Sequence, residues 1–374
     1  MNIIVVGGGI VGCAIAHELA SRGARVVVVD PRGTGQGATR ASAGMLAPYI
    51  EGHVPELREL CVRSLSLYDG FIDRLRAETD QPIEYERTGT LQVARGDAEA
   101  ERLREDAARL SSEGVDAALL GRGDVLRLVR PPIAADLSAG LLIRQHGYVV
   151  VQALVDGLVA SAQKAGALFT SERVMGVQNT DSGARVATMD RTIDGDAVVI
   201  AAGSWTNEIP AATDWSADVP PPSMPPPVKP IRGQLLRVRI SERLAPQVLW
   251  GSGCYIVPWG NGTTLVGATV EDVGFDERSS AAAIHDLLAA AFSLAPCLRG
   301  AAFEDVRVGL RPMATDELPI VGPSSTMPHV FYATGHYRNG ILLTPLTAVL
   351  VADLMLDGRA GAELKLMRPD RLGL

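Results

Sequence analysis

The pattern of apolar and polar positions near the start of the chain predicts a strand, a helix and a second strand. Residues 3–6 are four consecutive apolar residues, and the apolar positions within residues 14–19 have helical spacing. A second apolar run at residues 26–29 ends at Asp30. Continuous apolar strands joined by a helix are typical of a parallel sheet covered by helices.

Strand and helix patterns alternate along the rest of the chain. Strand-like patterns occupy residues 88–93, 197–201, 234–240, 254–258, 263–268 and 330–333. Helical patterns occupy residues 98–111, 148–165, 280–291 and 343–356. Residues 219–230 contain seven prolines, which exclude a helix or a central strand and predict an extended crossover between domains. The successive strands between residues 234 and 268 predict an antiparallel sheet.

The turn between the first strand and the first helix has the sequence Gly-x-Gly-x-x-Gly. In such a turn Gly7 permits the tight bend, Gly9 lets backbone N–H groups approach a pyrophosphate, and Gly12 permits close packing of helix on strand. The helix N-terminus favours phosphates, and Asp30 is placed to accept hydrogen bonds from ribose hydroxyls. A Gly-rich turn alone is a weak signal. Because strand, spacing, helix and acid agree, we predict an ADP-containing dinucleotide.

Length and charge narrow the classes of function. The chain has 374 residues, which favours two domains, and its net charge of −8 disfavours nucleic acid as a partner. It contains no apolar run of membrane-spanning length and no basic leader, so we expect a cytoplasmic protein without membrane contact. The four cysteines are far apart and the six histidines lack metal-ligand spacing, so we expect no disulfide and no bound metal.

The passage at residues 334–345 distinguishes between dinucleotides. It has the pattern of a strand, a loop and a helix, and therefore aims a second helix N-terminus at the ligand. A flavin gains from partial positive charge at its N1 and C2=O edge, where negative charge accumulates on reduction. A nicotinamide gains little from it. We therefore predict FAD.

Several short motifs together resemble a known family. They lie at residues 7–12, 41–47 (ASAGMLA), 229–234 (KPIRGQ), 254–258 (CYIVP), 267–269 (GAT), 309–312 (GLRP) and 335–343 (GHYRNGILL). Spread in order over nearly the whole chain, they look like those of the glycine oxidases of thiamine biosynthesis, within the D-amino-acid oxidase family of FAD-dependent amine oxidases. The resemblance implies non-covalent FAD, oxidative deamination of glycine or a related amine, and a homotetramer.

The patterns and the resemblance together predict the fold class. We expect an α/β fold in which a Rossmann-type FAD-binding domain is interleaved with an α+β substrate-binding domain built on an antiparallel sheet. The FAD-binding domain is expected at residues 1–86, 145–225 and 306–374, and the substrate-binding domain at residues 87–144 and 226–305. The resemblance implies cofactor contacts from Gly7, Gly9, Ile10, Val11, Gly12, Asp30, Ser42, Ala43, Gly44, Met45, Val174, Gly203, Arg311, His336, Arg338, Asn339, Gly340, Ile341 and Leu342.

Three side chains are candidates to bind the carboxylate of an amino-acid substrate. Arg311, which precedes Pro312, can bind it through two parallel hydrogen bonds, and Tyr255 can add an O–H donor. The resemblance places Arg338 beside the substrate and Met45 near the flavin face. With the carboxylate held, a hydride can leave the Cα–H bond for flavin N5 without a strong protein base, provided that the amine is neutral.

Each candidate also has a purely structural interpretation. Arg311 can form a surface ion pair, Tyr255 can be a core residue, and Arg338 can contact the flavin or close its loop. Met45 is better explained by packing. His336 is better explained by positioning than as a base, because hydride transfer needs none.

Two features of the chain depart from the resemblance. Val270 stands where we expect bulkier residues such as Met or Glu, and the Pro-rich segment is expanded. Both widen the predicted pocket, so glycine, sarcosine, another N-substituted glycine and a small D-amino acid stay open as substrates. No Cys or His stands where related enzymes link their flavin covalently.

Three classes of function stay open. The first is an oxidase that reduces O2 to H2O2, and the second is a dehydrogenase of the same fold that passes electrons to a quinone or carrier. The third is a non-catalytic or RNA-modifying flavoprotein. The acidic charge and the pair formed by Arg311 and Tyr255 disfavour this third class.

Overall fold

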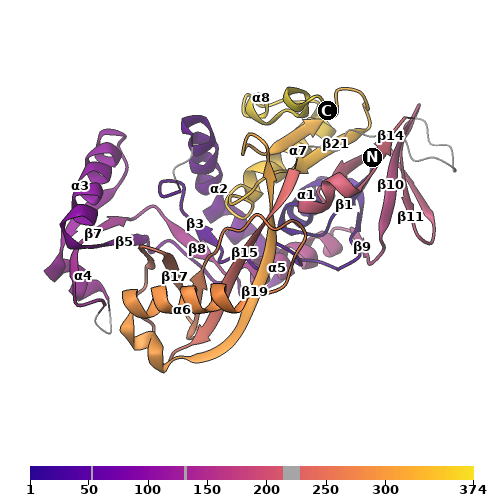
Figure 1. The fold of residues 1–374 in the computed structure, drawn as a ribbon. Helices are drawn as coiled ribbons and strands as arrows, with labels where there is room; N and C mark the ends of the chain where they lie inside the picture. The colour runs from indigo at the N-terminus through magenta and orange to yellow at the C-terminus, as the bar shows by residue number, and fades with distance from the viewer. Residues whose placement is uncertain (52–53, 130–132, 214–227) are drawn as a thin grey trace.

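A parallel sheet forms one layer of the molecule. The computed structural model describes residues 1–51, 54–129, 133–213 and 228–374 (Figure 1). The six strands of this sheet, in the order β20-β21-β13-β1-β2-β9, are β1 (Asn2–Val6), β2 (Arg25–Val29), β9 (Leu168–Thr170), β13 (Ala197–Ile200), β20 (Ile320–Pro323) and β21 (Val330–Thr334). All run parallel except β20, which pairs antiparallel at the edge. The apolar runs in β1, β2 and β13 are buried, as in a sheet covered on both faces.

Different elements cover the two faces of this sheet. One face shares a core with α1 (Ile10–Ser21), α2 (Pro55–Thr79), α5 (Val151–Lys164) and α7 (Thr344–Asp357). The other face packs against a four-stranded sheet made of β10 (Val174–Thr180), β11 (Gly183–Thr188), β12 (Thr192–Gly195) and β14 (Ala211–Ala212). Ile3 and Val5 pack on the helices while Ile4 and Val6 face the smaller sheet, because side chains alternate along a strand.

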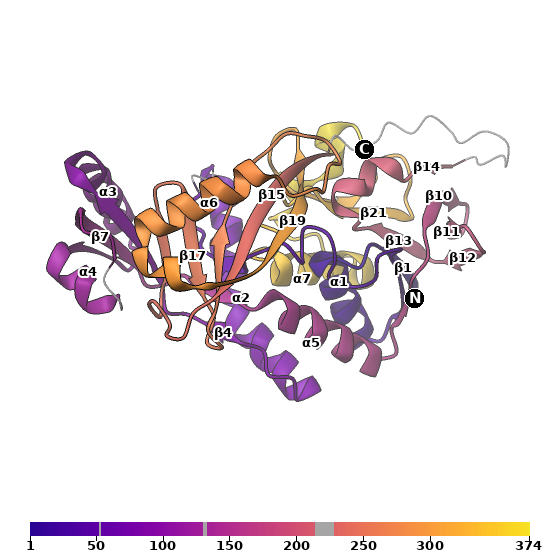
Figure 2. The ribbon, with the colours of Figure 1, turned by 60° about the horizontal axis from the view of Figure 1, so that its bottom comes forward.

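An eight-stranded sheet forms the second large layer. Its strands, in the order β19-β15-β18-β17-β16-β5-β7-β6, are β5 (Thr90–Arg95), β6 (Ala117–Gly121), β7 (Leu137–Ile143), β15 (Val228–Arg239), β16 (Val248–Gly251), β17 (Cys254–Pro258), β18 (Thr263–Gly267) and β19 (Ala302–Ala314). Neighbouring strands pair antiparallel except β5 and β16, which pair parallel. Helix α6 (Ala281–Leu294) lies across β15 and β17, and α3 (Gly96–Ser112) and α4 (Arg122–Leu128) pack near β7 (Figure 2).

Short elements complete the chain. A three-stranded sheet is formed by β3 (Met45–Leu46), β4 (Tyr85–Glu86) and β8 (Gly147–Val149). The remaining short helices are η1 (Gly203–Glu208), η2 (Pro296–Gly300), α8 (Leu364–Met367) and η3 (Pro369–Leu372). None of the described helices is both long enough and apolar enough to cross a membrane.

The predicted α/β fold is confirmed, and both large sheets combine segments far apart in the sequence. In the six-stranded sheet, β1 lies between β2 and β13, and β21 adds a strand from near the C-terminus. In the eight-stranded sheet, β5 to β7 join strands that follow residue 227. The domain boundaries stay a prediction, and β19 crosses residue 306 without a break. The parallel pair of β5 and β16 departs from the expected antiparallel sheet because β5 enters it from an earlier part of the chain.

Two local predictions differ from the structure. The helix expected from residue 148 begins at Val151, because Tyr148 is buried in β8 between β3 and β4. The partners that hold it are distant in sequence, so the local pattern does not show them. The Pro-rich crossover lies mainly outside the described residues, but residues 228–230 already belong to β15. Pro230 fits there because the described pairing at that position is with β19 only.

Candidate active site

The Gly-rich turn between β1 and α1 contains glycines required for different reasons. Gly7 has a φ of 114°, and a Cβ atom added there would collide with the carbonyl oxygen of Ala201. A Cβ at Gly12 would collide with the carbonyl oxygen of Gly7. Gly9, in contrast, has a φ of −68°, and the nearest atom to an added Cβ is Thr39 Oγ1 at 3.4 Å. Neither backbone strain nor crowding by the described protein requires glycine here, so the space fits a phosphate at the N-terminus of α1.

Asp30 follows β2 and braces this turn. One carboxylate oxygen accepts a hydrogen bond from Gly8 N at 2.8 Å, and the other accepts one from Arg32 N at 2.8 Å. The same side chain lines the large cavity described below. Asp30 therefore holds the turn in shape and also faces the space where the sequence predicts a ribose.

The loop between β21 and α7 brings the second helix N-terminus to the same cavity. Tyr337 N donates to Pro312 O, and Asn339 N donates to His336 O, both at 2.8 Å. His336 Nε2 lies 3.1 Å from Thr347 Oγ1. Burial lowers the pKa of His336 to about 4, so its imidazole is neutral at pH 7. This residue fixes the loop and adds no charge to the site.

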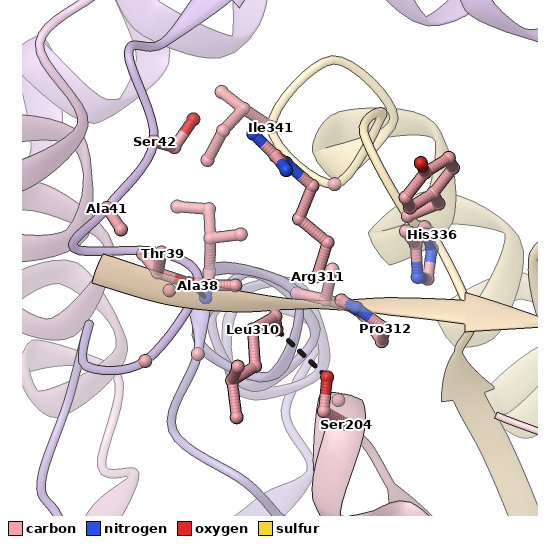
Figure 3. Close-up of a pocket in the computed structure, with 18 of the residues that line it drawn as sticks. Ala38, Thr39, Ala41, Ser42, Ser204, Leu310, Arg311, Pro312, His336 and Ile341 are labelled. Carbon is pink, nitrogen blue, oxygen red and sulfur yellow. Dashed lines mark hydrogen bonds between the residues drawn. The ribbon is translucent and has the colours of Figure 1, made fainter. Parts of the chain in front are cut away.

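Arg311 points into the cavity from near the C-terminal end of β19. Figure 3 shows its side chain leaving the strand toward Ile341, while Leu310 lies on the opposite side and its carbonyl accepts a hydrogen bond from Ser204. The guanidinium lies over Gly233 of β15, where a Cβ would collide with it. Arg311 Nη1 donates to Thr269 O at 2.9 Å. No carboxylate of the described residues forms an ion pair with Arg311, which argues against the surface ion-pair interpretation.

Tyr255 reaches the cavity from β17. Its ring stacks on that of Trp250 from β16, with the ring centroids 5.5 Å apart. Gly267 of β18 leaves room beside it, because a Cβ there would collide with the Tyr255 hydroxyl. Burial raises the pKa of Tyr255 to about 12, so the phenol stays protonated and is a hydrogen-bond donor at neutral pH.

Arg338 lies in the loop before α7 and is more exposed than Arg311. Its guanidinium lies 5.0 Å from the centroid of the Tyr337 ring, and Nη2 donates to the Tyr337 hydroxyl at 3.3 Å. This stacking holds the side chain at the cavity wall. The structure thus brings Arg311, Tyr255 and Arg338 to one site from three separate elements.

A single cavity of about 620 Å³ connects these regions. Its wall includes every residue that the sequence analysis proposed for the cofactor or the substrate, apart from Gly12 and Gly44. Gly12 does not line the cavity, but it packs against Gly7, which does. Gly44 has a φ of 76°, and a Cβ there would collide with the carbonyl oxygen of Val149. Both glycines therefore shape the cavity through packing.

The sequence analysis missed several residues of the cavity wall. Trp205 carries the guanidinium of Arg32 at 4.2 Å from its ring centroid, and Thr39 accepts a hydrogen bond from Ile10 N at 3.0 Å. Glu51 also lines the cavity. Burial raises the pKa of the Glu51 carboxyl, and the guanidinium groups of Arg338 and Arg311 partly oppose that rise. The proximity of Arg32 to Asp30 in sequence was an available signal, whereas Glu51 belongs to no motif.

Comparison with known proteins gives consistent matches. The chain matches the family model described as FAD dependent oxidoreductase (DAO) over residues 2–354. It is 34% identical over 358 residues to the glycine oxidase of Geobacillus kaustophilus, which covers 95% of this chain and 92% of that protein. The crystal structure of glycine oxidase from Geobacillus kaustophilus has a TM-score of 0.88 at 33% identity, covering 96% of this chain and 95% of that one.

Another group of relatives is longer than this chain. The chain is 35% identical over 368 residues to the bifunctional protein ThiO/ThiG of Nostoc sp. strain PCC 7120, covering 96% of this chain and 53% of that protein. It thus spans about half the length of such bifunctional relatives. The family model and the Geobacillus match, in contrast, extend over nearly the whole chain. The chain therefore belongs to the DAO family of FAD-dependent oxidoreductases.

Proposed function

We propose that this chain is an amine oxidase that acts on glycine or a related small amino acid, with FAD held non-covalently. The observation that carries the proposal is the shared cavity. Arg311, Tyr255 and Arg338 face the same space as the Gly-rich turn and the N-terminus of α7. A cofactor at that turn and a carboxylate at Arg311 therefore have room in one continuous site.

The residues of the chain would bind and orient the substrate. Arg311 offers the guanidinium donors that the carbonyl oxygens of Thr269 and Arg232 do not use, and Tyr255 offers a hydroxyl proton, so both favour a carboxylate between them. Holding the carboxylate fixes the direction of the Cα–H bond. FAD held at the Gly-rich turn and Asp30 would supply the acceptor for the hydride of that bond, and O2 would take up the two electrons as H2O2. The resulting imine is hydrolysed by water to the carbonyl product and an amine or ammonia.

The side chain at one position of the cavity wall favours substrates larger than glycine. Val270 lines the cavity at a position where the family resemblance suggests bulkier side chains such as Met or Glu. The shorter side chain leaves room for a substituent on the amine or on Cα. Sarcosine, other N-substituted glycines and small D-amino acids are therefore included in the proposal.

The cavity wall includes one histidine and one cysteine, residue types that form covalent flavin links in other proteins. His336 Nε2 is hydrogen-bonded to Thr347, and burial raises the pKa of the Cys254 thiol to about 12, so the thiol is protonated and a poor nucleophile at pH 7. FAD should therefore be released by acid or heat. All four cysteines are free thiols, which supports the proposed cytoplasmic location. The family resemblance implies a homotetramer, and light scattering would measure the molar mass of the assembly in solution.

The proposal is tested by mixing the purified yellow protein anaerobically with glycine, sarcosine, N-alkylglycines and D-amino acids. We expect at least one of them to bleach the flavin absorbance, and readmitted O2 to restore it with formation of H2O2. Bleaching without rapid recovery in O2 would favour the dehydrogenase that uses a quinone or carrier. If no amine bleaches the flavin, the proposed function is wrong.

A further inference from the structure

Glu51 is a cavity residue with no role so far. It ends a turn that follows β3, and this turn is anchored by Tyr49, whose ring stacks on His146 at 5.6 Å between centroids. The Oε2 atom of Glu51 is buried and has no hydrogen-bond partner among the described residues. A buried carboxylate oxygen without a donor is costly in free energy. Because Glu51 also lines the cavity, its carboxyl group is placed to meet a donor carried by a ligand.

The charges around Glu51 suggest what that ligand carries. Arg311 and Arg338 line the same cavity, and both are close enough to influence the titration of the Glu51 carboxyl. Among the ion pairs of the described residues, none joins Glu51 to Arg311 or to Arg338. The carboxylate is therefore not a counter-ion in direct contact with either arginine. Opposite charges face one cavity with space between them.

A zwitterionic amino acid matches this arrangement. Its carboxylate complements the two guanidinium groups, and its ammonium group carries the hydrogen-bond donors that Glu51 Oε2 lacks. A ligand with only a carboxylate satisfies the arginines but brings a second negative charge toward Glu51. The cavity should therefore distinguish amino acids from simple carboxylic acids of the same shape.

We propose that Glu51 binds the amine of the substrate and makes the site selective for zwitterionic primary and secondary α-amino acids. This inference rests on the proposed function, because it assigns the second half of the same substrate. Glu51 binds the ammonium form in which the substrate arrives, and the amine loses one proton before hydride transfer, so Glu51 acts in binding and in no covalent step. It also gives a reason for a buried carboxyl that the fold itself does not use.

Two ligands of equal shape test this assignment without turnover. 2-Aminoisobutyrate carries an ammonium group and a carboxylate but has no Cα–H bond, so it cannot be oxidised by hydride loss. Pivalate replaces the ammonium group by a methyl group. Titration of the FAD-loaded protein, followed by flavin absorbance and by calorimetry, gives the Kd of each ligand.

We expect the wild type to bind 2-aminoisobutyrate about tenfold or more tightly than pivalate, as a charge-assisted hydrogen bond predicts. Glu51→Gln should raise the Kd for 2-aminoisobutyrate about tenfold and should lower or leave unchanged the Kd for pivalate, because a repelling charge is lost. Glu51→Asp keeps the charge but shortens the reach, and should give an intermediate preference. Glu317→Gln is the matched control, since Glu317 is exposed, affects Arg338 electrostatically and does not line the cavity.

Three outcomes would overturn the assignment. They are equal loss of affinity for both ligands in Glu51→Gln, no preference for 2-aminoisobutyrate in the wild type, and no binding of either ligand. The wild-type comparison holds even if a variant fails to fold. Because binding is measured without turnover, an intact preference in a protein that oxidises no amine would contradict the proposed function but not the role of Glu51.

Discussion

The cofactor side and the substrate side of the cavity are built in different ways. On the cofactor side, β1, α1 and β2 follow one another in sequence, and backbone atoms form much of the wall at Gly7 and Gly9. On the substrate side, Arg311, Tyr255 and Arg338 come from three separate elements, and their side chains provide the charge and the donors. One side depends on local backbone geometry, and the other on tertiary placement of side chains.

This difference separates the expected effects of mutations. Changes on the cofactor side should alter FAD retention or the stability of the apoprotein, because the turn packs against the residues that follow β13 and against Asp30. Changes on the substrate side should alter substrate binding while FAD stays bound. The following predictions test that separation, in order of decreasing effect.

The largest effect is expected at Arg311. Arg311→Ala leaves a substrate carboxylate without its charged partner, so kcat/KM should fall. The fall should correspond to a loss of about 2 to 5 kcal/mol of transition-state stabilisation. Arg311→Lys keeps the charge but loses the planar arrangement of donors, and should recover only part of the loss. Steady-state kinetics with the best amine of the anaerobic screen measures both variants.

The same variants contain their own control for the comparison. Both should keep FAD and react normally with O2 after chemical reduction, and amines without a carboxylate should be poor substrates that are little affected. If Arg311→Ala keeps near-normal kcat/KM, the carboxylate assignment is wrong and Arg338 is the next residue to replace. Loss of FAD from Arg311→Ala would show that the two sides are not separable.

Two glycines of one turn should behave differently. Gly12→Ala places a Cβ against the carbonyl oxygen of Gly7, so the apoprotein should lose about 1 to 3 kcal/mol of stability. Gly9→Ala has 3.4 Å to its nearest neighbour, so apoprotein stability should change by less than about 1 kcal/mol while FAD affinity falls about tenfold or more.

Denaturant unfolding of the apoproteins and FAD titration measure the two quantities independently. The contrast is the essential result, because a ligand and not the protein is inferred to require Gly9. Normal FAD affinity in Gly9→Ala would mean that the phosphates approach the turn elsewhere. Equal destabilisation of both apoproteins would mean that Gly9 also serves packing.

Asp30 should combine both kinds of effect. Asp30→Ala removes the predicted acceptor for the ribose hydroxyls and should weaken FAD binding by about 1.5 to 3 kcal/mol. It also removes the acceptor of Gly8 N, so the apoprotein should lose some stability as well. The turnover rate of the enzyme that still holds FAD should stay close to normal.

FAD titration and unfolding of Asp30→Asn provide the matched comparison. The amide keeps one acceptor oxygen for the backbone N–H groups but removes the negative charge, so it should retain more stability than Asp30→Ala. Unchanged FAD affinity in both variants would show that Asp30 serves only the turn.

The two sides also differ in how far the sequence predicts them. The Gly-rich turn and Asp30 could be predicted because one short strand–turn–helix–strand unit fixes both their spacing and their geometry. Periodicity also predicted α3, α6 and α7 and the strands β1, β2, β5, β13, β15, β17, β18 and β21, whereas β19 and the sheet of β10, β11, β12 and β14 were not predicted. β8 was missed because its partners, β3 and β4, are far away in sequence, and a short apolar stretch suits a strand or a helix equally.

The substrate side was predictable only in part. Arg311, Tyr255 and Arg338 were proposed as site residues from short motifs and a family resemblance, and they line one cavity. Glu51 could not be proposed, because a carboxyl after an irregular turn carries no periodicity and its buried Oε2 atom depends on tertiary packing. Long-range contacts therefore decide the residues that local patterns leave undefined.

The smallest effect is expected from the pH dependence of His336, in the loop that joins the two sides. Burial lowers the pKa of His336 to about 4 in the folded protein, whereas an unfolded histidine has a pKa of about 6.5. Between these values the unfolded state binds more protons, so the free energy of unfolding should fall as the pH falls from about 6.5 toward 4. At pH 5 the loss attributable to His336 should be about 1 to 2 kcal/mol relative to pH 7.

His336→Gln should show a smaller loss of unfolding free energy between pH 7 and pH 5, while His285→Gln, at an exposed position, should match the wild type. Denaturant unfolding at both pH values measures this, and equal losses in His336→Gln and the wild type would show that His336 is not held neutral by the fold.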